Sequence, residues 1–208
     1  MRFEADALSA RRGEDLLFRD ISFTLSDGEA LVVTGPNGSG KSTLLRVLAG
    51  LLPQESGAVR FVDSAEDRPA REACHYLGHR NAMKRELTVE ENLTFWADFM
   101  AKEGAVPGMD IDEAAESVGL SGITHLPFGY LSAGQQRRMA MAKLLVAKRP
   151  VWILDEPTAA LDVKADQMFA GLCRAHLAEG GMLVAATHQP LGIDSVKSLV
   201  MKGFEYGE

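Results

Sequence analysis

Residues 35–42, GPNGSGKS, limit the possible folds of this chain more than any other segment. They match the pattern G-x-x-x-x-G-K-[ST]. An apolar run, ALVVT at 30–34, comes directly before them, and a helical pattern, TLLRVLAGL at 43–51, follows. In that context, loop amides and the positive end of a helix face the phosphates of a nucleotide. A flexible glycine-rich turn is the alternative, but it requires neither the strand nor the helix. The sequence therefore predicts a phosphate loop in an α/β fold.

The side chains of this loop suit ATP with Mg²⁺. Lys41, one of the predicted catalytic residues, would reach the β and γ phosphates, Ser42 would hold Mg²⁺, and Thr43 could touch the α phosphate. We expect ATP as the nucleotide and Mg²⁺ as its ion. The predicted nucleotide contacts in this segment are Gly35, Pro36, Asn37, Gly38, Ser39, Gly40, Lys41, Ser42 and Thr43.

Two further apolar runs, VWILD at 151–155 and MLVAAT at 182–187, do not alternate with polar residues. Such runs are typical of parallel strands that are covered on both faces. Asp155 and Glu156 stand at the carboxyl end of the first run, where α/β sheets place their ligands. Asp155 can bind Mg²⁺ through its water shell, and Glu156 can polarise the attacking water. Alone, two acids after a strand would mark only its end; after a phosphate loop they predict a catalytic pair.

The rest of the chain predicts one domain, residues 1–208, without repeats or a linker. Apolar residues alternate with polar ones near the start, at 3–7 and 21–25, which is the period of antiparallel strands. Thr88 with Glu91, and Asp110 with Glu113, are typical helix starts. We therefore expect a helical insert at about 80–135 within a core of strands and helices.

Composition excludes several classes of function. The formal charge is −7, from 22 basic and 29 acidic residues, which argues against non-specific binding of nucleic acid. Cys74 and Cys173 are the only cysteines, so a reduced compartment is expected. No segment approaches the roughly 20 apolar residues that span a bilayer. We expect a soluble chain that would reach a membrane only through another polypeptide.

Five elements resemble the ATP-binding cassette (ABC) family: the phosphate loop, LSAGQ at 131–135 as its signature motif, DEPTAALD at 155–162 as its Walker B motif and D-loop, and His188 in ATHQP as its switch histidine. The resemblance covers nearly the whole chain. It implies an α/β fold, a P-loop NTPase of the ABC type with an antiparallel β subdomain and a helical subdomain. It also implies catalysis by Glu156 and His188, together with Lys41.

The same resemblance implies a head-to-tail homodimer with two ATP molecules between the subunits. Ser132, Gly134 and Gln135 would then contact the ATP of a second copy, and Asp162 would help to couple the two halves. Ser132 is a suitable N-cap, so the positive end of a helix would face an anion; that helix is expected to end at residues 148–150. We interpret Arg137 and Arg138 as a solvated helix face rather than as arginine fingers.

Two positions depart from the family pattern. Arg12 occupies the slot where an aromatic ring commonly stacks on adenine; its guanidinium could stack on the base or be solvated, so the base preference stays open. His79 occupies the slot of the Q-loop glutamine. A neutral ring nitrogen could replace the glutamine oxygen as an acceptor near Mg²⁺ or the attacking water, or His79 could contact a membrane partner.

The segment YLGH at 76–79, followed by Lys84, LT at 87–88 and ENL at 91–93, resembles one branch of the family, the ATP-binding subunits of haem exporters in cytochrome c maturation. This implies haem export or release of a haem-loaded chaperone, integral membrane ABC subunits as partners, and a peripheral location at the cytoplasmic face of the inner membrane. The alternatives are the ATPase of a transporter for another substrate, a soluble non-transport ABC ATPase and a non-hydrolysing module.

Two further expectations concern partners. CHYLGH at 74–79 does not match the haem-attachment pattern C-x-x-C-H, so haem is expected to be handled by the complex and not by this chain. Nucleic acid is not an expected partner. Phe95, Trp96 and Phe99 are crowded beside the Q-loop. We expect at least one of them to be substantially buried, and Phe95 or Phe99 to face the membrane partner.

Overall fold

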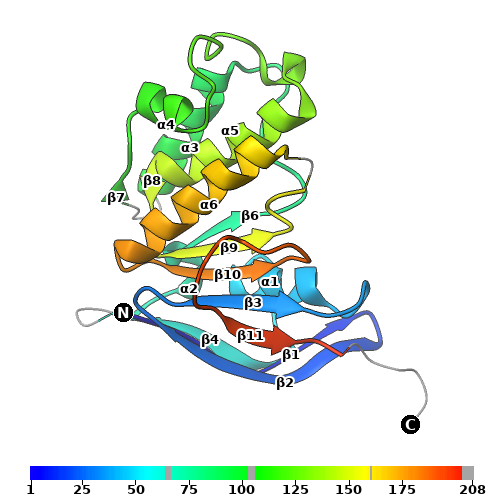
Figure 1. Ribbon diagram of the computed structural model, residues 1–208. Helices are drawn as coiled ribbons and strands as arrows, with labels where there is room; N and C mark the ends of the chain where they lie inside the picture. The colour runs from blue at the N-terminus through cyan, green and yellow to red at the C-terminus, as the bar shows by residue number, and fades with distance from the viewer. Residues whose placement is uncertain (64–66, 103–105, 160, 203–208) are drawn as a thin grey trace.

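The computed structural model describes residues 1–63, 67–102, 106–159 and 161–202, which form two main sheets (Figure 1). The antiparallel sheet has the order β2-β1-β4-β5. The parallel sheet has the order β11-β3-β10-β9-β6, and each pair of neighbours in it is parallel. The strands of the antiparallel sheet are β1 (Arg2–Arg12), β2 (Asp15–Ser26), β4 (Ser56–Val62) and β5 (Asp67–Arg68). Those of the parallel sheet are β3 (Ala30–Thr34), β6 (Cys74–Leu77), β9 (Val151–Asp155), β10 (Met182–Ala186) and β11 (Lys197–Val200).

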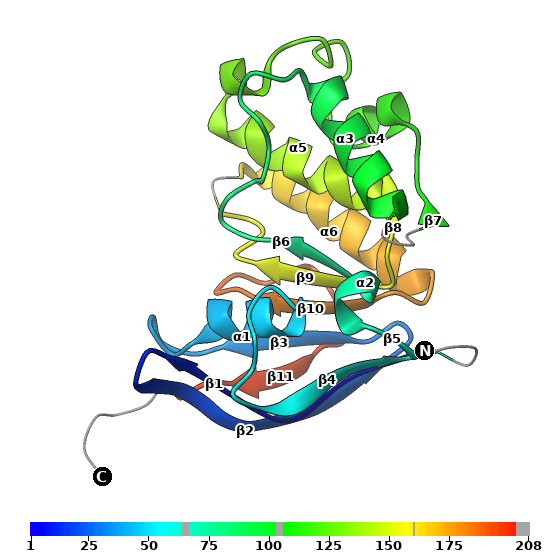
Figure 2. The same cartoon turned by 180° about the vertical axis from the view of Figure 1, so that it is seen from behind.

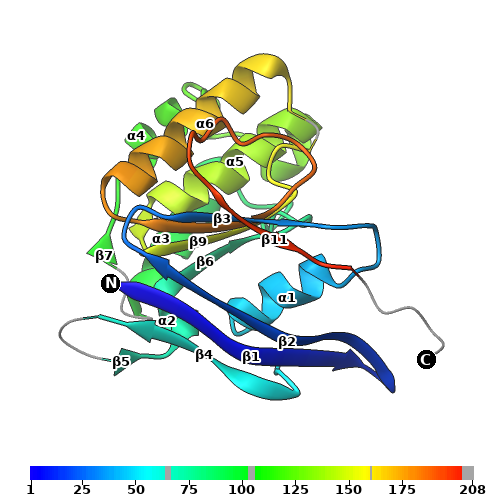
Figure 3. The ribbon, with the colours of Figure 1, turned by 60° about the horizontal axis from the view of Figure 1, so that its bottom comes forward.

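Helices separate and cover these sheets. Figures 2 and 3 show α1 (Lys41–Leu48) between the two sheets, while α5 (Ala133–Leu145) and α6 (Val163–Ala178) lie on the other side of the parallel sheet. Beyond α5 lie α3 (Val89–Lys102) and α4 (Ile111–Ser117). The short elements are α2 (Ala70–Ala73), β7 (Val106–Pro107), η1 (Phe128–Tyr130) and β8 (Ala147–Lys148). Within the described residues, no helix is both long and apolar enough to cross a membrane.

The parallel sheet has a hydrophobic core on each face. Val151 and Ile153 of β9 pack with α1 and the antiparallel sheet. Trp152 and Leu154, which point to the opposite face, pack with residues of α5 and α6. This confirms the interpretation of the unalternating apolar runs as strands covered on both sides.

The prediction of regular alternation at the start of the chain is wrong at Ala7. Phe3 and Ala5 are buried, but Ala7 is exposed, and burial resumes at Leu8. The register of β1 with β2 shifts between Ala5 and Leu8, and Ala7 has φ 46°. A β-bulge therefore adds a residue and moves the inward positions by one, as bulges do.

The three predicted helix starts are confirmed. Thr88 Oγ1 accepts from Glu91 N at 3.1 Å while a Glu91 carboxylate oxygen accepts from Thr88 N at 2.8 Å, a complete capping box. Ser132 and Gln135 form a second box at the start of α5. Asp110 caps α4 by accepting from Glu113 N at 2.8 Å.

The predicted end of the signature helix is wrong. α5 ends at Leu145, and Ala147–Lys148 instead pairs with Val106–Pro107 as an antiparallel strand. Arg149, expected to end the helix, is buried, and its Nη1 donates to the carbonyl oxygens of Arg71 and Cys74 at 2.8 and 2.9 Å. Contacts with residues distant in the sequence thus stop the helix early, although local propensity allows it to continue.

Candidate active site

Four loops meet at the carboxyl edge of the parallel sheet. Gly35 follows β3, Gly78 follows β6, Glu156 follows β9 and Thr187 follows β10. Because these strands are parallel and adjacent, their carboxyl ends lie at one edge of the sheet (Figure 1). The fold thus brings the phosphate loop, His79, the Asp155–Glu156 pair and His188 together.

The phosphate loop has the backbone that its glycines allow. Gly40 is the N-cap of α1 with φ 92°, a conformation unfavourable for other residues. Gly35 has φ 141°, and a Cβ there would collide with the carbonyl oxygen of Met201, which follows β11. The loop can therefore wrap closely at the start of α1, where the first amides of the helix have no carbonyl partner within it.

Polar groups inside this loop fit an anionic ligand. Lys41 Nζ folds back to donate to the carbonyl oxygens of Gly35 and Pro36 at 2.7 and 3.0 Å. Ser39 Oγ is buried and has no hydrogen-bond partner within the described part of the chain. A cation, an unsatisfied hydroxyl and helix amides at one place provide the donors that phosphate oxygens accept from.

Asp155 is the most buried charged group of the site, with 1% of its surface exposed. Its Oδ1 accepts from Ser42 Oγ at 3.1 Å and its Oδ2 from the Tyr76 hydroxyl at 3.3 Å. Burial raises the pKa of Tyr76, so the hydroxyl keeps its proton as a donor. A hydrogen bond to Tyr76 raises the pKa of Arg46, and the negative charge of Asp155 acts in the same direction. Carboxylate and hydroxyl oxygens side by side are ligands that suit Mg²⁺.

Glu156 and the two histidines approach each other more loosely. His188 Nε2 is 3.7 Å from a carboxylate oxygen of Glu156, and His79 Nε2 is 3.9 Å from Asp155 Oδ1. The side chain of His79 is 59% exposed. Glu156 itself has φ 46°, a left-handed conformation that is uncommon for a residue with a Cβ atom. Both histidines face the acids from solvent-accessible positions, where a ligand could enter between them.

Arg137 was missed by the sequence interpretation, and the expected solvated face is wrong. Its side chain is only 5% exposed and donates to the carbonyl oxygens of Glu156 and Pro157 in the loop after β9. Arg138 is partly buried and donates to Val118 and Gly119. The available signal was spacing: Arg137 shares a helix face with Met141 and Leu144, both buried.

The remaining predicted residues are not gathered at this edge. Ser132 and Gln135 cap the start of α5, and Asp162 caps α6 by accepting from Ala165 N at 2.8 Å. α5 and α1 lie on opposite sides of the parallel sheet (Figures 1 and 2), so the signature motif does not face its own phosphate loop. Arg12 ends β1, but its side chain lies outside the described part of the structure.

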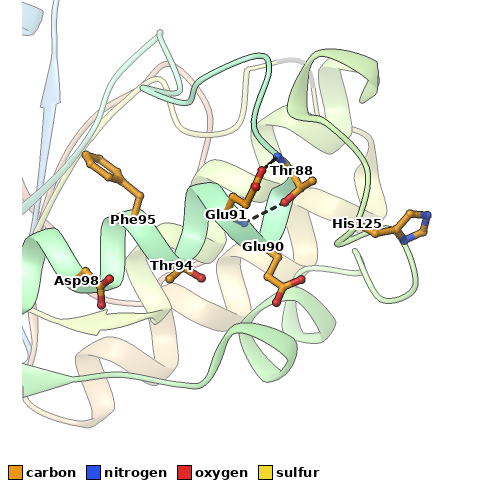
Figure 4. A pocket seen from close by; sticks show the side chains of 7 residues that line it. All are labelled: Thr88, Glu90, Glu91, Thr94, Phe95, Asp98 and His125. Atoms are coloured by element: carbon orange, nitrogen blue, oxygen red, sulfur yellow. Dashed lines mark hydrogen bonds between the residues drawn. The ribbon is translucent and has the colours of Figure 1, made fainter.

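A second concave feature lies on the outer face of α3, away from the sheet. Figure 4 shows its lining, with Thr94, Asp98 and Glu90 along α3 and His125 on a separate loop. The volume is about 590 Å³. We call this feature the acidic pocket. It is lined by Thr88, Glu90, Glu91, Thr94, Phe95, Asp98 and His125.

Two aromatic side chains beside the acidic pocket are exposed. Phe95 is 46% exposed and Phe99 43% exposed, and their rings stack with centroids 6.0 Å apart. Trp96 is half-buried; its Nε1 donates to Ala82 O at 3.0 Å, and Lys143 Nζ lies 4.6 Å from its ring centroid. Trp96 is thus tied to the chain itself, while Phe95 and Phe99 form an apolar surface open to solvent.

The fold and the edge of the sheet define a nucleotide-binding ATPase of the phosphate-loop class. Comparisons with known proteins narrow this class. The model of the family described as "ABC transporter" matches residues 18–159. The chain belongs to this family, and it is therefore an ATP-binding, ATP-hydrolysing chain of the ABC type.

Individual relatives agree over nearly the whole length. The chain is 69% identical to "Cytochrome c biogenesis ATP-binding export protein CcmA" of Rhizobium meliloti, over 98% of this chain and 99% of that one. It is 65% identical to the protein of the same name from Agrobacterium fabrum, over 98% and 97% of the two chains. Its fold matches that of an ABC transporter ATP-binding protein from Pyrococcus furiosus, with a TM-score of 0.78, 22% identity and 97% and 98% coverage.

Proposed function

We propose that this chain is the ATPase subunit of a membrane complex in cytochrome c biogenesis, and that the complex exports haem or releases a haem-loaded chaperone. The observation that carries the proposal is the 69% identity, over 98% of the chain, to a protein named for ATP-binding export in that process. A phosphate loop with both acids intact supports hydrolysis rather than nucleotide binding alone. The ATPase of a transporter for another substrate is the alternative.

In the proposed site, the phosphates of ATP lie in the loop at residues 35–43. They replace the carbonyl oxygens of Gly35 and Pro36 as the hydrogen-bond acceptors of Lys41. Ser42, Asp155 and His79 would hold Mg²⁺. Ser42 Oγ lies 3.1 Å from Asp155 Oδ1, and His79 Nε2 lies 3.9 Å from the same oxygen. When bound, Mg²⁺ neutralises charge on the phosphate oxygens. Arg12 would flank the base.

Hydrolysis is assigned to Glu156 and His188. Glu156 would orient and polarise the attacking water, and His188, 3.7 Å from its carboxylate, would steady that carboxylate beside the γ phosphate. Lys41 would place positive charge against the transferred group, where it stabilises the transition state. These roles need no movement of Asp155, whose oxygens already accept hydrogen bonds from within the chain.

A second copy of the chain would complete the site. The start of α5 faces away from its own phosphate loop, and its first intrahelical bond is made by Gln136 N to Ser132 O at 2.8 Å. Of the amides before that bond, that of Gln135 donates to Ser132 Oγ, while those of Ala133 and Gly134 precede the helix ladder and can meet an anion. We propose that Ser132, Gly134 and Gln135 contact ATP held by the second copy, with Asp162 beside the same interface.

The integral membrane subunit would bind at the outer face of α3. Phe95 and Phe99 offer exposed aromatic area there, and Glu90, Glu91 and Asp98 line the acidic pocket next to them. These features complement a segment that carries both apolar and basic side chains. The chain would thus sit peripherally at the cytoplasmic face of the inner membrane. Neither nucleic acid nor direct haem ligation has a place in this proposal.

The test is purification of the tagged chain from solubilised membranes, with identification of the accompanying proteins and measurement of haem. We expect integral membrane subunits and haem to copurify with wild type. A Phe95→Glu/Phe99→Glu variant should lose both while it still hydrolyses ATP. Membrane subunits without haem would favour another exported substrate, and ATPase activity with no membrane subunit at all would contradict the proposal.

A further inference from the structure

Arg137 connects the catalytic loops to the signature helix. It lies in the second turn of α5, five residues after Ser132, and is almost fully buried. Its guanidinium donates to the carbonyl oxygens of Gly78 at 2.7 Å, Pro157 at 2.9 Å and Glu156 at 2.8 Å. Longer contacts of 3.4 Å reach Asn81 Oδ1 and Asp155 O. One side chain thus holds both loops that carry the predicted catalytic groups.

Such a contact is specific to an arginine. Burial lowers the pKa of Arg137, and the negative charge of Asp155 acts in the opposite direction. A guanidinium stays charged even so, and its planar fork presents donors in several directions at once. Neither lysine nor glutamine has this planar fork of donors, so neither can donate to the carbonyl groups of Gly78 and Glu156 at the same time. The closest hydrogen-bond acceptors of Arg137 are backbone carbonyl oxygens of two loops. Arg137 therefore fixes the positions of these two backbone segments.

The backbone of Glu156 is the part that most needs fixing. Its left-handed conformation is unfavourable for a residue with a Cβ atom and persists only where the surroundings impose it. Glu156 N donates to Ala186 O at 2.9 Å, which holds the residue from the side of β10. Arg137 holds its carbonyl group from the side of α5. The direction of the Glu156 carboxylate thus depends on both contacts.

We propose that Arg137 is a positioning residue for hydrolysis: it holds Glu156 in its left-handed conformation and the loop of His79 beside it, and it links both to the signature helix. Movement of α5 toward a second copy would then change the position of Glu156. This inference rests on the proposed catalytic role of Glu156.

Arg138 provides a matched control on the same helix. It is also an arginine that donates to two carbonyl groups, Val118 at 3.1 Å and Gly119 at 2.9 Å, but these belong to the end of α4 and not to the catalytic loops. Arg137→Gln and Arg138→Gln each remove a charged fork from α5. A difference in ATP turnover between them reports the contacts with the catalytic loops.

The first experiment compares steady-state ATP hydrolysis by the two full-length variants. For Arg137→Gln we expect kcat to fall by roughly 10- to 100-fold while KM for ATP changes by less than about threefold, because the phosphate loop is untouched. Arg138→Gln should keep kcat within about twofold of wild type. Equal kcat values for the two variants, or a loss confined to KM, would overturn the proposal.

The second experiment combines Arg137→Gln with Glu156→Gln. Because Arg137 acts through Glu156, its loss should cost less than about threefold in single-turnover rate once Glu156 is replaced. An undiminished loss in that background would overturn the inference while leaving the role of Glu156 intact. Full activity of Glu156→Gln alone would instead overturn the proposed catalytic role of Glu156, on which this inference rests.

Arg137→Lys is the variant to measure if Arg137→Gln does not fold. Lysine keeps the buried charge but reaches fewer of the carbonyl groups, so kcat should fall by roughly 3- to 10-fold with KM unchanged. A folded Arg137→Lys protein with the kcat of wild type would overturn the inference.

Discussion

At the carboxyl edge of the parallel sheet, Asp155 is buried and both of its carboxylate oxygens accept hydrogen bonds, whereas on the outer face of α3 two phenylalanine rings are almost half exposed. At the edge, Ser42 and Tyr76 donate to the Asp155 carboxylate, and Arg137 donates to the neighbouring backbone carbonyl groups. The outer face of α3 has its apolar groups beside the acids of a pocket that is open among the described residues. The acidic groups of the first region are thus held by the chain itself, whereas the exposed aromatic rings of the second form a surface suited to an interaction partner.

Glu156→Gln is expected to have the largest effect on ATP hydrolysis at the carboxyl edge of the parallel sheet. The change removes the charge that would polarise water and leaves Lys41, Ser42 and the loop backbone in place. We expect kcat to fall at least about 100-fold, equivalent to roughly 2.7 kcal/mol in the barrier, with ATP binding retained. The variant should accumulate as an ATP-bound dimer, detectable by size-exclusion chromatography in MgATP. A monomer with wild-type turnover would remove Glu156 from catalysis.

Acid should destabilise the protein through two buried histidines beside the parallel sheet. Burial lowers the pKa of His75 to about 3 and that of His176 to about 4. His75 Nε2 donates to Ala147 O at 2.7 Å, and His176 stacks on Trp152 with ring centroids 4.1 Å apart. The unfolded chain binds a proton on each histidine below about pH 6.5, while the folded chain does not until much lower pH. Stability is therefore lost as the pH falls below 6.5.

The expected loss is about 1 kcal/mol per histidine between pH 6.5 and 5.5, measured as the free energy of unfolding in urea. His176→Phe offers a control because the ring can still stack on Trp152 while the titrating group is gone. Its stability should fall about half as steeply over that interval. Identical slopes for the variant and wild type would exclude His176 as a source of the acid effect.

A third change tests whether the outer face of α3 is an interaction surface. Phe95→Ser/Phe99→Ser removes exposed aromatic area, so ATP hydrolysis by the chain alone should stay within about twofold of wild type. Affinity for detergent-solubilised membrane subunits should fall about tenfold, equivalent to roughly 1.4 kcal/mol. Leu51→Ser, which changes an exposed leucine just after α1, is the matched control and should bind normally. Equal binding by both variants would place the membrane partner elsewhere.

The sequence predicts some parts of the molecule better than others. The phosphate loop, the strands at 30–34 and 151–155 and the three helix starts depend on residues close together in the chain, and local patterns identified them. Arg137 depends on carbonyl groups up to 59 residues away. Every residue has a carbonyl group, so those partners leave no mark in the sequence, and the arginine was interpreted as solvated.

The early end of α5 has the same cause, because it is imposed by β7 and by carbonyl groups near α2. The bulge at Ala7 depends in part on Ser22 Oγ, which accepts from Ala7 N at 2.8 Å across the sheet. In each case a long-range partner overrode a local preference. Phe95 or Phe99 is expected from the sequence to face a partner, and the structure exposes both rings. Only the folded chain shows that Trp96 is the half-buried one, with its indole N–H donating to Ala82 O.

The smallest effects come from the two capping boxes, one at the start of α3 and one at the start of α5. Thr88→Ala and Ser132→Ala each remove a side-chain acceptor from a helix start, so each should lower the free energy of unfolding by about 1 kcal/mol.

The two variants should differ in ATP-dependent dimer formation. Thr88 begins α3 beside the acidic pocket, and its loss should leave ATP-dependent dimer formation unchanged. Ser132 begins α5, and in the proposed dimer it meets the ATP of the second copy, so its loss should weaken dimer formation by several-fold at equal stability. Sedimentation of both variants, each also carrying Glu156→Gln to retain ATP, measures this difference. Dimers of equal strength would mean that Ser132 is only a helix cap and that the signature motif does not contact the second nucleotide through it.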